Sequence, residues 1–134
     1  MSETTTVSVE FNILGEEFPT NIITDTLNLF PTDVYHKGEL SRTNKLRKET
    51  CWSLATPYEA SFDINDQLNS IISKIKPQTD HLLQLKETYS LSFSFMIVIN
   101  IENNAKPAIY FDVDTIHFAS EIKATINFDY YIYS

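Results

Sequence analysis

The sequence predicts an α+β fold, a two-layer sandwich in which a mainly antiparallel sheet carries helices on one face. Several segments alternate apolar and polar residues with a period of two, the longest being residues 91–101 (LSFSFMIVINI), and this pattern is typical of strands that bury one face. Other segments repeat apolar residues every three to four positions, as amphipathic helices do. Strands with one apolar face and helices with one apolar stripe can bury both apolar surfaces when a layer of helices covers one side of the sheet. With 134 residues, of which 43% are hydrophobic, the chain suits a single domain over 1–134.

The first half of the chain is predicted to begin and end in strands. In order, its patterns predict a strand over 7–13, a helix over 19–29 that Pro31 ends, a short strand over 34–36, an exposed loop over 41–49 and a strand over 51–56. The loop assignment rests on charged residues and loop formers without an apolar period.

The second half contains the clearest helix. Asp63 is a candidate N-cap, and an apolar face follows at Ile64, Leu68, Ile71, Ile72 and Ile75 before Pro77 breaks the helix. Further on, we expect helical turns from a cap at Thr79 through Leu85, the long strand 91–101, a strand over 108–111, a helix capped by Asp112 or Asp114 that buries Thr115, Phe118, Ala119 and Ile122, and a strand over 125–133. The predicted order is β-α-β-β-α-β-β-α-β.

The outward face of the predicted sheet is polar with aromatic residues. Its predicted members are Ser8, Glu10, Asn12, Ser92, Ser94, Asn127, Asp129, Tyr131 and Tyr133. Because tyrosine is enriched at protein interfaces, we predict that Asp129, Tyr131 and Tyr133 belong to an interface with a partner or a second subunit.

Charge and composition narrow the classes of partner. The net charge is −8, which disfavours general nucleic-acid binding. No apolar run approaches a membrane span, and Met1 is not followed by a signal peptide, so we expect no membrane association. The single cysteine fits a reducing compartment, and a cytoplasmic location is expected. The predicted partners are therefore another protein or a second copy.

Two clusters are candidates for catalytic or metal sites. Asp112, Asp114 and His117 carry oxygen and imidazole ligands, but helix capping explains their positions better than metal binding does. Cys51 with His36 as base would need a lowered thiol pKa, and the strand context favours a buried, inert thiol. With only two glycines, the chain has no phosphate-binding loop. We therefore assign no catalytic residue, no metal ligand and no cofactor, and we favour a non-enzymatic role.

Five of the ten Lys and Arg residues lie within residues 37–48. A solvated loop is the ordinary interpretation of such a run. The alternative is a small-molecule or anion site in which this basic loop folds over the only tryptophan, with Lys37, Glu39, Lys45, Arg47, Lys48 and Trp52 as its residues.

Several short motifs resemble a known family. Ile23-Thr24-x-x-Leu27-x-Leu29-x-Pro31-Thr32, then Lys37-Gly38-Glu39, Trp52 and the closing Phe128-Asp129-Tyr130-Tyr131 are similar to the small bacterial family called domain of unknown function 4279. In that family a glycine commonly follows the helix leucine, where this chain has Asn28, which also tolerates a left-handed cap. The resemblance implies a fold and no catalytic residues, because the family has no established activity.

Three functional hypotheses follow, the third being an enzyme, which would need Asp112, Asp114 and His117, or Cys51 with His36, to converge in space. The first is a protein-interaction module, in its sharper form an immunity-type protein that neutralises a basic toxin. The second is the small-molecule or anion-binding domain built on the basic loop and Trp52.

Overall fold

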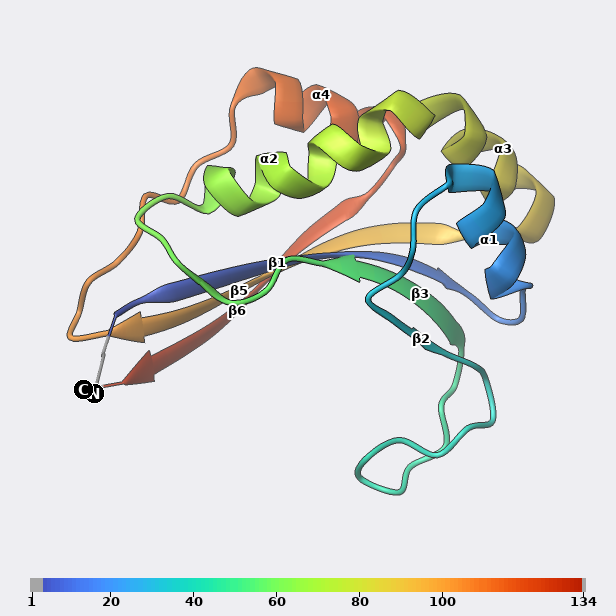
Figure 1. Cartoon of the computed structure of the whole chain (residues 1–134), viewed down its shortest axis with the longest axis horizontal. Coiled ribbons are helices and arrows are strands. Elements are labelled where there is room, and N and C mark those ends of the chain that lie inside the picture. The colour runs from blue at the N-terminus through green and yellow to red at the C-terminus, as the bar shows by residue number, and fades with distance from the viewer. Residues whose placement is uncertain (1–3, 134) are drawn as a thin grey trace.

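The computed structural model describes residues 4–133, which form one six-stranded sheet with its helices on one side (Figure 1). The elements in order are β1 (Thr6–Gly15), α1 (Thr20–Leu27), β2 (Asp33–Tyr35), β3 (Thr50–Ala55), β4 (Glu59–Ala60), α2 (Ile64–Ile75), the 3₁₀ turn η1 (Lys76–Gln78), α3 (Thr79–Tyr89), β5 (Ser92–Glu102), α4 (Val113–Glu121) and β6 (Thr125–Tyr133). The predicted two-layer α+β architecture is confirmed.

The strands lie in the order β2-β3-β1-β5-β6, and β4 pairs with the start of β1. All pairs are antiparallel except β5 with β6. A parallel pair needs a crossover connection, and α4 supplies it between these two strands. The strand over 91–101 is β5, next to the central β1.

The core lies between the sheet and the helices. On β1, Val7, Val9, Phe11 and Ile13 all face the helices and are fully buried. The ring of Phe11 packs against Phe93 and Phe95 of β5, with centroids 5.6 and 5.2 Å apart. All five apolar residues predicted for the face of α2 are buried here. Burying these side chains is the main source of stability, at about 25 cal/mol per Å² of apolar surface.

Several local predictions hold. Asp63 caps α2 by accepting from the Asn65 amide, and Asp112 caps α4 by accepting from the Thr115 amide. Asn28 ends α1 in the left-handed region at φ 54°, as expected for a residue that replaces glycine. The residues predicted to face inward from α4 are buried.

Two predictions were wrong. Residues 108–111 form no strand, because Ala108 hydrogen-bonds to Phe62 and to Ile64, the first residue of α2, outside the main sheet. Thr79 does not cap α3: the η1 turn joins α2 directly to α3, and the Thr79 hydroxyl donates to the Lys76 carbonyl instead. The observed order after β3 is therefore β4, α2, η1, α3, β5, α4, β6.

The second face of the sheet is not covered by helices. In Figure 1 the strand ends bend away from the helices, so this outer face is concave, and the loop between β2 and β3 projects on the same side. None of the helices in residues 4–133 is long and apolar enough to cross a bilayer.

Candidate binding site on the outer sheet face

The sheet register aligns polar residues in a row across the outer face. Asp33 of β2 lies opposite Ser53 of β3, Ser53 opposite Asn12 of β1, and Asn12 opposite Ser94 of β5. Each belongs to the outward half of its strand's alternation. The row crosses four strands that are far apart in sequence.

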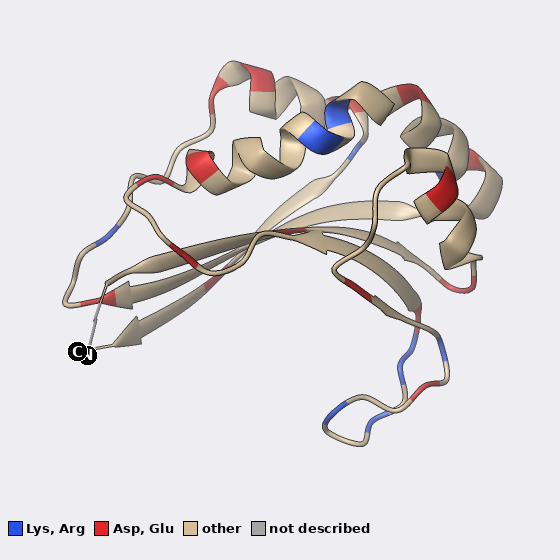
Figure 2. Cartoon of the chain, viewed as in Figure 1, with Lys and Arg blue, Asp and Glu red and all other residues tan. Residues whose placement is uncertain are grey.

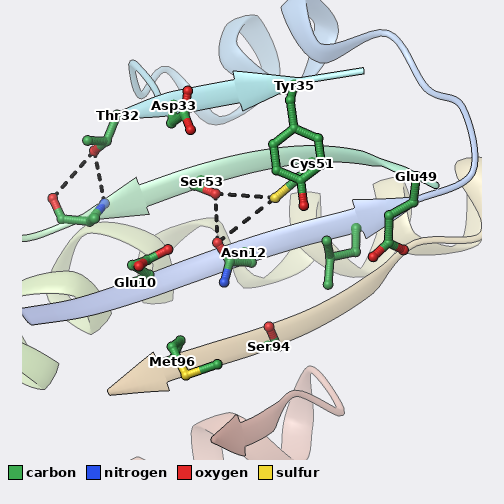
Figure 3. A pocket seen from close by; sticks show the side chains of 12 residues that line it. Glu10, Asn12, Thr32, Asp33, Tyr35, Glu49, Cys51, Ser53, Ser94 and Met96 are labelled. Carbon is green, nitrogen blue, oxygen red and sulfur yellow. Dashed lines mark hydrogen bonds between the residues drawn. The ribbon is translucent and has the colours of Figure 1, made fainter. Parts of the chain in front are cut away.

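Hydrogen bonds hold the middle of this row. The Ser53 hydroxyl donates to Asn12 Oδ1 at 2.6 Å, and Cys51 Sγ lies 3.2 Å from the same hydroxyl (Figure 3). Ser53 and Cys51 are both buried. The floor is therefore a buried polar network held by hydrogen bonds.

Above this floor lies a hollow of about 470 Å³, which we call the outer-face hollow. Three carboxylates line it, from Glu10, Asp33 and Glu49, and no Lys or Arg stands among the described residues that line it. Tyr35, Leu14 and Met96 supply apolar surface (Figure 3). The hollow thus combines negative charge with apolar walls.

Glu10 is the lining carboxylate whose pKa the surrounding hollow raises. Burial raises the pKa of its carboxyl, and the neighbouring charges of Asp33 and Asp129 raise it further. Asp129 stands on β6, so the negative field extends from β2 to the far edge of the sheet. A cation placed here would relieve this repulsion.

Cys51 and Tyr35 are both set up to stay protonated. Burial raises the pKa of the Cys51 thiol. Burial is also the main cause that raises the pKa of Tyr35 to about 12, and interaction with Cys51 is the second cause. A thiol with a raised pKa is a poor nucleophile. His36 contacts Thr20 of α1 and Glu39, not Cys51, so the structure does not assemble this pair.

Tyrosines continue the outer face beside the hollow. Burial raises the pKa of Tyr58, and the nearby charge of Glu10 raises it further. The ionisable groups of Tyr131, Asp129 and Tyr133 act in the same direction, so their side chains lie close to Tyr58. Tyr131 and Tyr133 are about half exposed, as is Tyr58. The predicted interface residues Asp129, Tyr131 and Tyr133 therefore lie on the same outward face as the hollow.

The basic loop does not form the predicted site with Trp52. Trp52 is fully buried on the helix side of β3, and its indole N–H donates to Thr24 Oγ1 at 3.0 Å. A buried ring offers no surface for a ligand to stack on, so this part of the prediction was wrong. The reason is the alternation on β3, which turns Trp52 away from the face that carries Cys51 and Ser53.

The loop residues themselves lie in two places. Lys37 pairs with Glu16 at 2.6 Å, and Glu39 pairs with His36. Lys45, Arg47 and Lys48 instead surround a hollow of about 300 Å³ next to Tyr35 and Glu49. Figure 2 shows the concentration of positive charge on this loop, which hangs below the sheet.

The remaining cluster is structural. Asp112 is the N-cap of α4, and its interaction with the Thr115 amide lowers the pKa of the Asp112 carboxyl. Within residues 4–133, no group of three or more His, Cys, Asp or Glu side chains is placed to hold a metal ion. Asp112, Asp114 and His117 therefore do not form a metal site among the described residues.

Sequence reasoning missed Asp33, Tyr35 and Glu49 as site residues. Asp33 and Tyr35 stand on a three-residue strand, too short to show its outward face by alternation. Glu49 belongs to a charged segment whose pattern indicates a solvated loop. Only the register across β2, β3 and β1 brings these residues to one place.

The fold and the hollow define a class of protein: a small α+β sandwich in which no helix covers the second, hollowed face of the sheet. The chain belongs to the family described as Domain of unknown function (DUF4279), whose model matches residues 3–133. The resemblance noted from the sequence motifs is thereby confirmed. No curated protein and no solved structure matches the chain.

Proposed function

We propose that this chain binds another protein through the outer face of its sheet and that the partner presents a basic, partly apolar segment there. The observation that carries the proposal is the outer-face hollow, which three carboxylates and no Lys or Arg line among the residues described. The role is one of binding, without catalysis.

The electrostatics support a cationic group as the part of the partner that enters the hollow. Glu10 is partly buried, and its neighbours Asp33 and Asp129 carry the same charge. A Lys or Arg side chain from the partner would replace this repulsion by attraction. Arg fits best, because its planar guanidinium can bond a carboxylate in two places.

The tyrosines support a protein as the partner. Tyr58, Tyr131 and Tyr133 present half-exposed rings beside the charged hollow. Tyrosine contributes large contact area at low cost in conformational entropy, and it is enriched among residues that dominate binding energy. The face therefore combines an acidic recess with aromatic anchors.

In its sharper form, the proposal makes this chain an immunity-type protein that neutralises a toxin. The net charge of −8 and the acidic hollow suit a basic partner such as a nuclease. This form rests on analogy with small acidic inhibitors and is judged by the identity of the partner.

The experiment compares three tagged forms as bait in lysate of the source cells, at low and high salt, with mass spectrometry. The forms are the wild type, the outer-face variant Glu10→Gln/Asp33→Asn/Asp129→Asn, and a control with equal loss of charge on the helices, Asp25→Asn/Asp80→Asn/Glu87→Gln. We expect a basic protein that the wild type and the control retain at low salt and the outer-face variant loses. Equal retention by all three forms would overturn the proposal.

The second candidate is an anion site on the basic loop without Trp52. It is supported by the way Lys45, Arg47 and Lys48 surround one hollow. Titration with inorganic phosphate, followed by NMR, tests it. Shifts confined to residues 41–48 that disappear in Lys45→Ala/Lys48→Ala would support an anion site, and unchanged spectra would exclude it.

A further inference from the structure

The last strand of the sheet, β6, has a long unpaired edge. One side of β6 pairs with β5 along nine residues, and no other described segment hydrogen-bonds to its main chain. The opposite end of the sheet is closed differently: β2 there is three residues long, and the two-residue β4 covers the start of β1. Short edge strands are a common way to prevent pairing between sheets, and β6 lacks that protection.

β6 also lacks the side chains that usually protect an edge. Its sequence, TINFDYYIY, contains no Pro, Lys or Arg, and Asp129 is its single charge. The residues from Tyr130 to Tyr133 are between 47% and 69% exposed, although they alternate between the two faces. Exposure on both faces at once is what a missing neighbouring strand leaves.

We propose that a second copy of this chain occupies this edge, with the two β6 strands antiparallel about a two-fold axis at Tyr130. In this register Tyr130 faces its own copy, Asp129 faces Tyr131, Phe128 faces Ile132 and Asn127 faces Tyr133. Aromatic and aliphatic cross-strand pairs of this kind stabilise antiparallel sheets. The sheets of the two copies become one continuous sheet.

The neighbouring registers are worse for stated reasons. An axis at Asp129 places the two carboxylates directly opposite each other, which is destabilising. An axis at Phe128 also pairs seven residues, 125–131, but it leaves the exposed Ile132 and Tyr133 opposite residues before Thr125, where the chain is not a strand. An axis at Tyr131 pairs only 129–133, whereas the axis at Tyr130 pairs 127–133.

The interaction is expected to be weak and to respond to salt in a characteristic direction. One pair of strands buries little area compared with a stable interface. Each copy carries a charge of −8, so added salt should screen the repulsion and strengthen the dimer. Binding of a basic partner to the outer-face hollow responds to salt in the opposite direction, which separates the two proposals.

Analytical ultracentrifugation over a range of protein concentrations tests the dimer. We expect concentration-dependent dimers of the wild type, and at least a tenfold weaker association for Tyr130→Lys/Ile132→Lys, since the ammonium groups introduced at position 130 would face each other across the axis. The control Ile22→Lys/Leu40→Lys changes the charge equally at exposed apolar positions away from β6 and should dimerise like the wild type. A wild type that stays monomeric up to about 1 mM, or equal dimerisation of all forms, would overturn the proposal.

Two further measurements keep the test decisive if the lysine variant does not fold. Hydrogen exchange of wild-type amides in β6 should slow as concentration rises. With added oxidised glutathione, Tyr130→Cys should form a covalent dimer, because directly opposed residues lie about 4.5–5.5 Å apart at Cα, within disulfide reach. Tyr133→Cys, at a similarly exposed position but opposite Asn127, should not. Crosslinking of both to the same extent, or of neither, would refute the register.

Discussion

The guanidinium carbon of Arg47 lies 4.0 Å from the centre of the Tyr35 ring. This contact joins the basic loop to a residue that also lines the acidic outer-face hollow. Positive and negative surfaces therefore meet at Tyr35, and the loop is positioned at the rim of the hollow and not over the core tryptophan.

Replacing Arg47 by alanine should loosen the loop with little effect on the fold. A cation–π contact at a partly exposed site contributes about 0.5–1 kcal/mol, so the free energy of unfolding should fall by no more than that. Amides of residues 38–48 should exchange faster with solvent, as measured by hydrogen exchange. Arg42→Ala, in the same loop, is the control; equal effects of both substitutions would contradict the role of the Tyr35 contact.

Replacing Thr24 by valine should destabilise the chain through Trp52. The substitution leaves a fully buried indole N–H without its acceptor, which costs about 1–3 kcal/mol. Denaturant unfolding followed by the fluorescence of the single tryptophan measures the change. Thr26→Val, on the same helix but without a bond to Trp52, should be close to neutral, and a similar loss in both variants would argue against the hydrogen bond.

Replacing Glu10 by glutamine should stabilise the chain at neutral pH. The folded chain raises the pKa of Glu10 above its ordinary value of 4.5, so the folded state binds the proton more tightly than the unfolded state. The stabilisation that comes from this tighter proton binding is fully present below pH 4.5, and it is lost as the pH rises through the pKa of Glu10 in the folded state. At pH 7 the variant should gain up to about 1 kcal/mol, a modest value because solvent screens the partly exposed carboxyl.

Thermal unfolding between pH 4 and 7 checks this expectation. The difference between Glu10→Gln and the wild type should shrink toward zero at the acid end. Glu87→Gln, on the exposed surface of α3, should follow the wild type throughout. If the stabilities of Glu10→Gln and the wild type changed with pH in parallel, the pKa of Glu10 would not be raised in the folded state.

Replacing Asp63 by alanine should weaken the start of α2. The carboxylate accepts from the Asn65 main chain and side chain and from the Tyr110 hydroxyl, and loss of an N-cap costs about 1 kcal/mol. These bonds lower the pKa of Asp63 below 3.8, so its contribution is present above that pH and is lost as pH falls through the folded pKa. Chemical denaturation at pH 7 and pH 3 measures both effects. Asp66→Ala removes a charge from the same helical turn but no cap, and an equal loss there would rule out capping.

Much of the fold could be predicted from local pattern. The alternation in β1 and β5 predicted which side chains face the core, and the 3.6-residue period predicted the buried face of α2. On β6 the alternation predicted the inward face, but Tyr130 and Ile132 on that face stay exposed. The caps at Asp63 and Asp112 were also predictable, because a cap depends on residues two or three positions away. The strand predicted over 108–111 was wrong because the hydrogen-bond partners of Ala108 are Phe62 and Ile64, more than 40 residues away in the sequence.

The sequence by itself therefore determined the two faces of each long strand, the buried stripes of the helices and the acidic balance of the chain, all of which depend on near neighbours or on composition. The tertiary structure alone decided the strand order, the register that aligns Asp33, Ser53 and Asn12, and the separation of Trp52 from the basic loop. The physical reason is that strand pairing joins residues by hydrogen bonds between distant segments. No local pattern specifies which of several compatible strands becomes the neighbour.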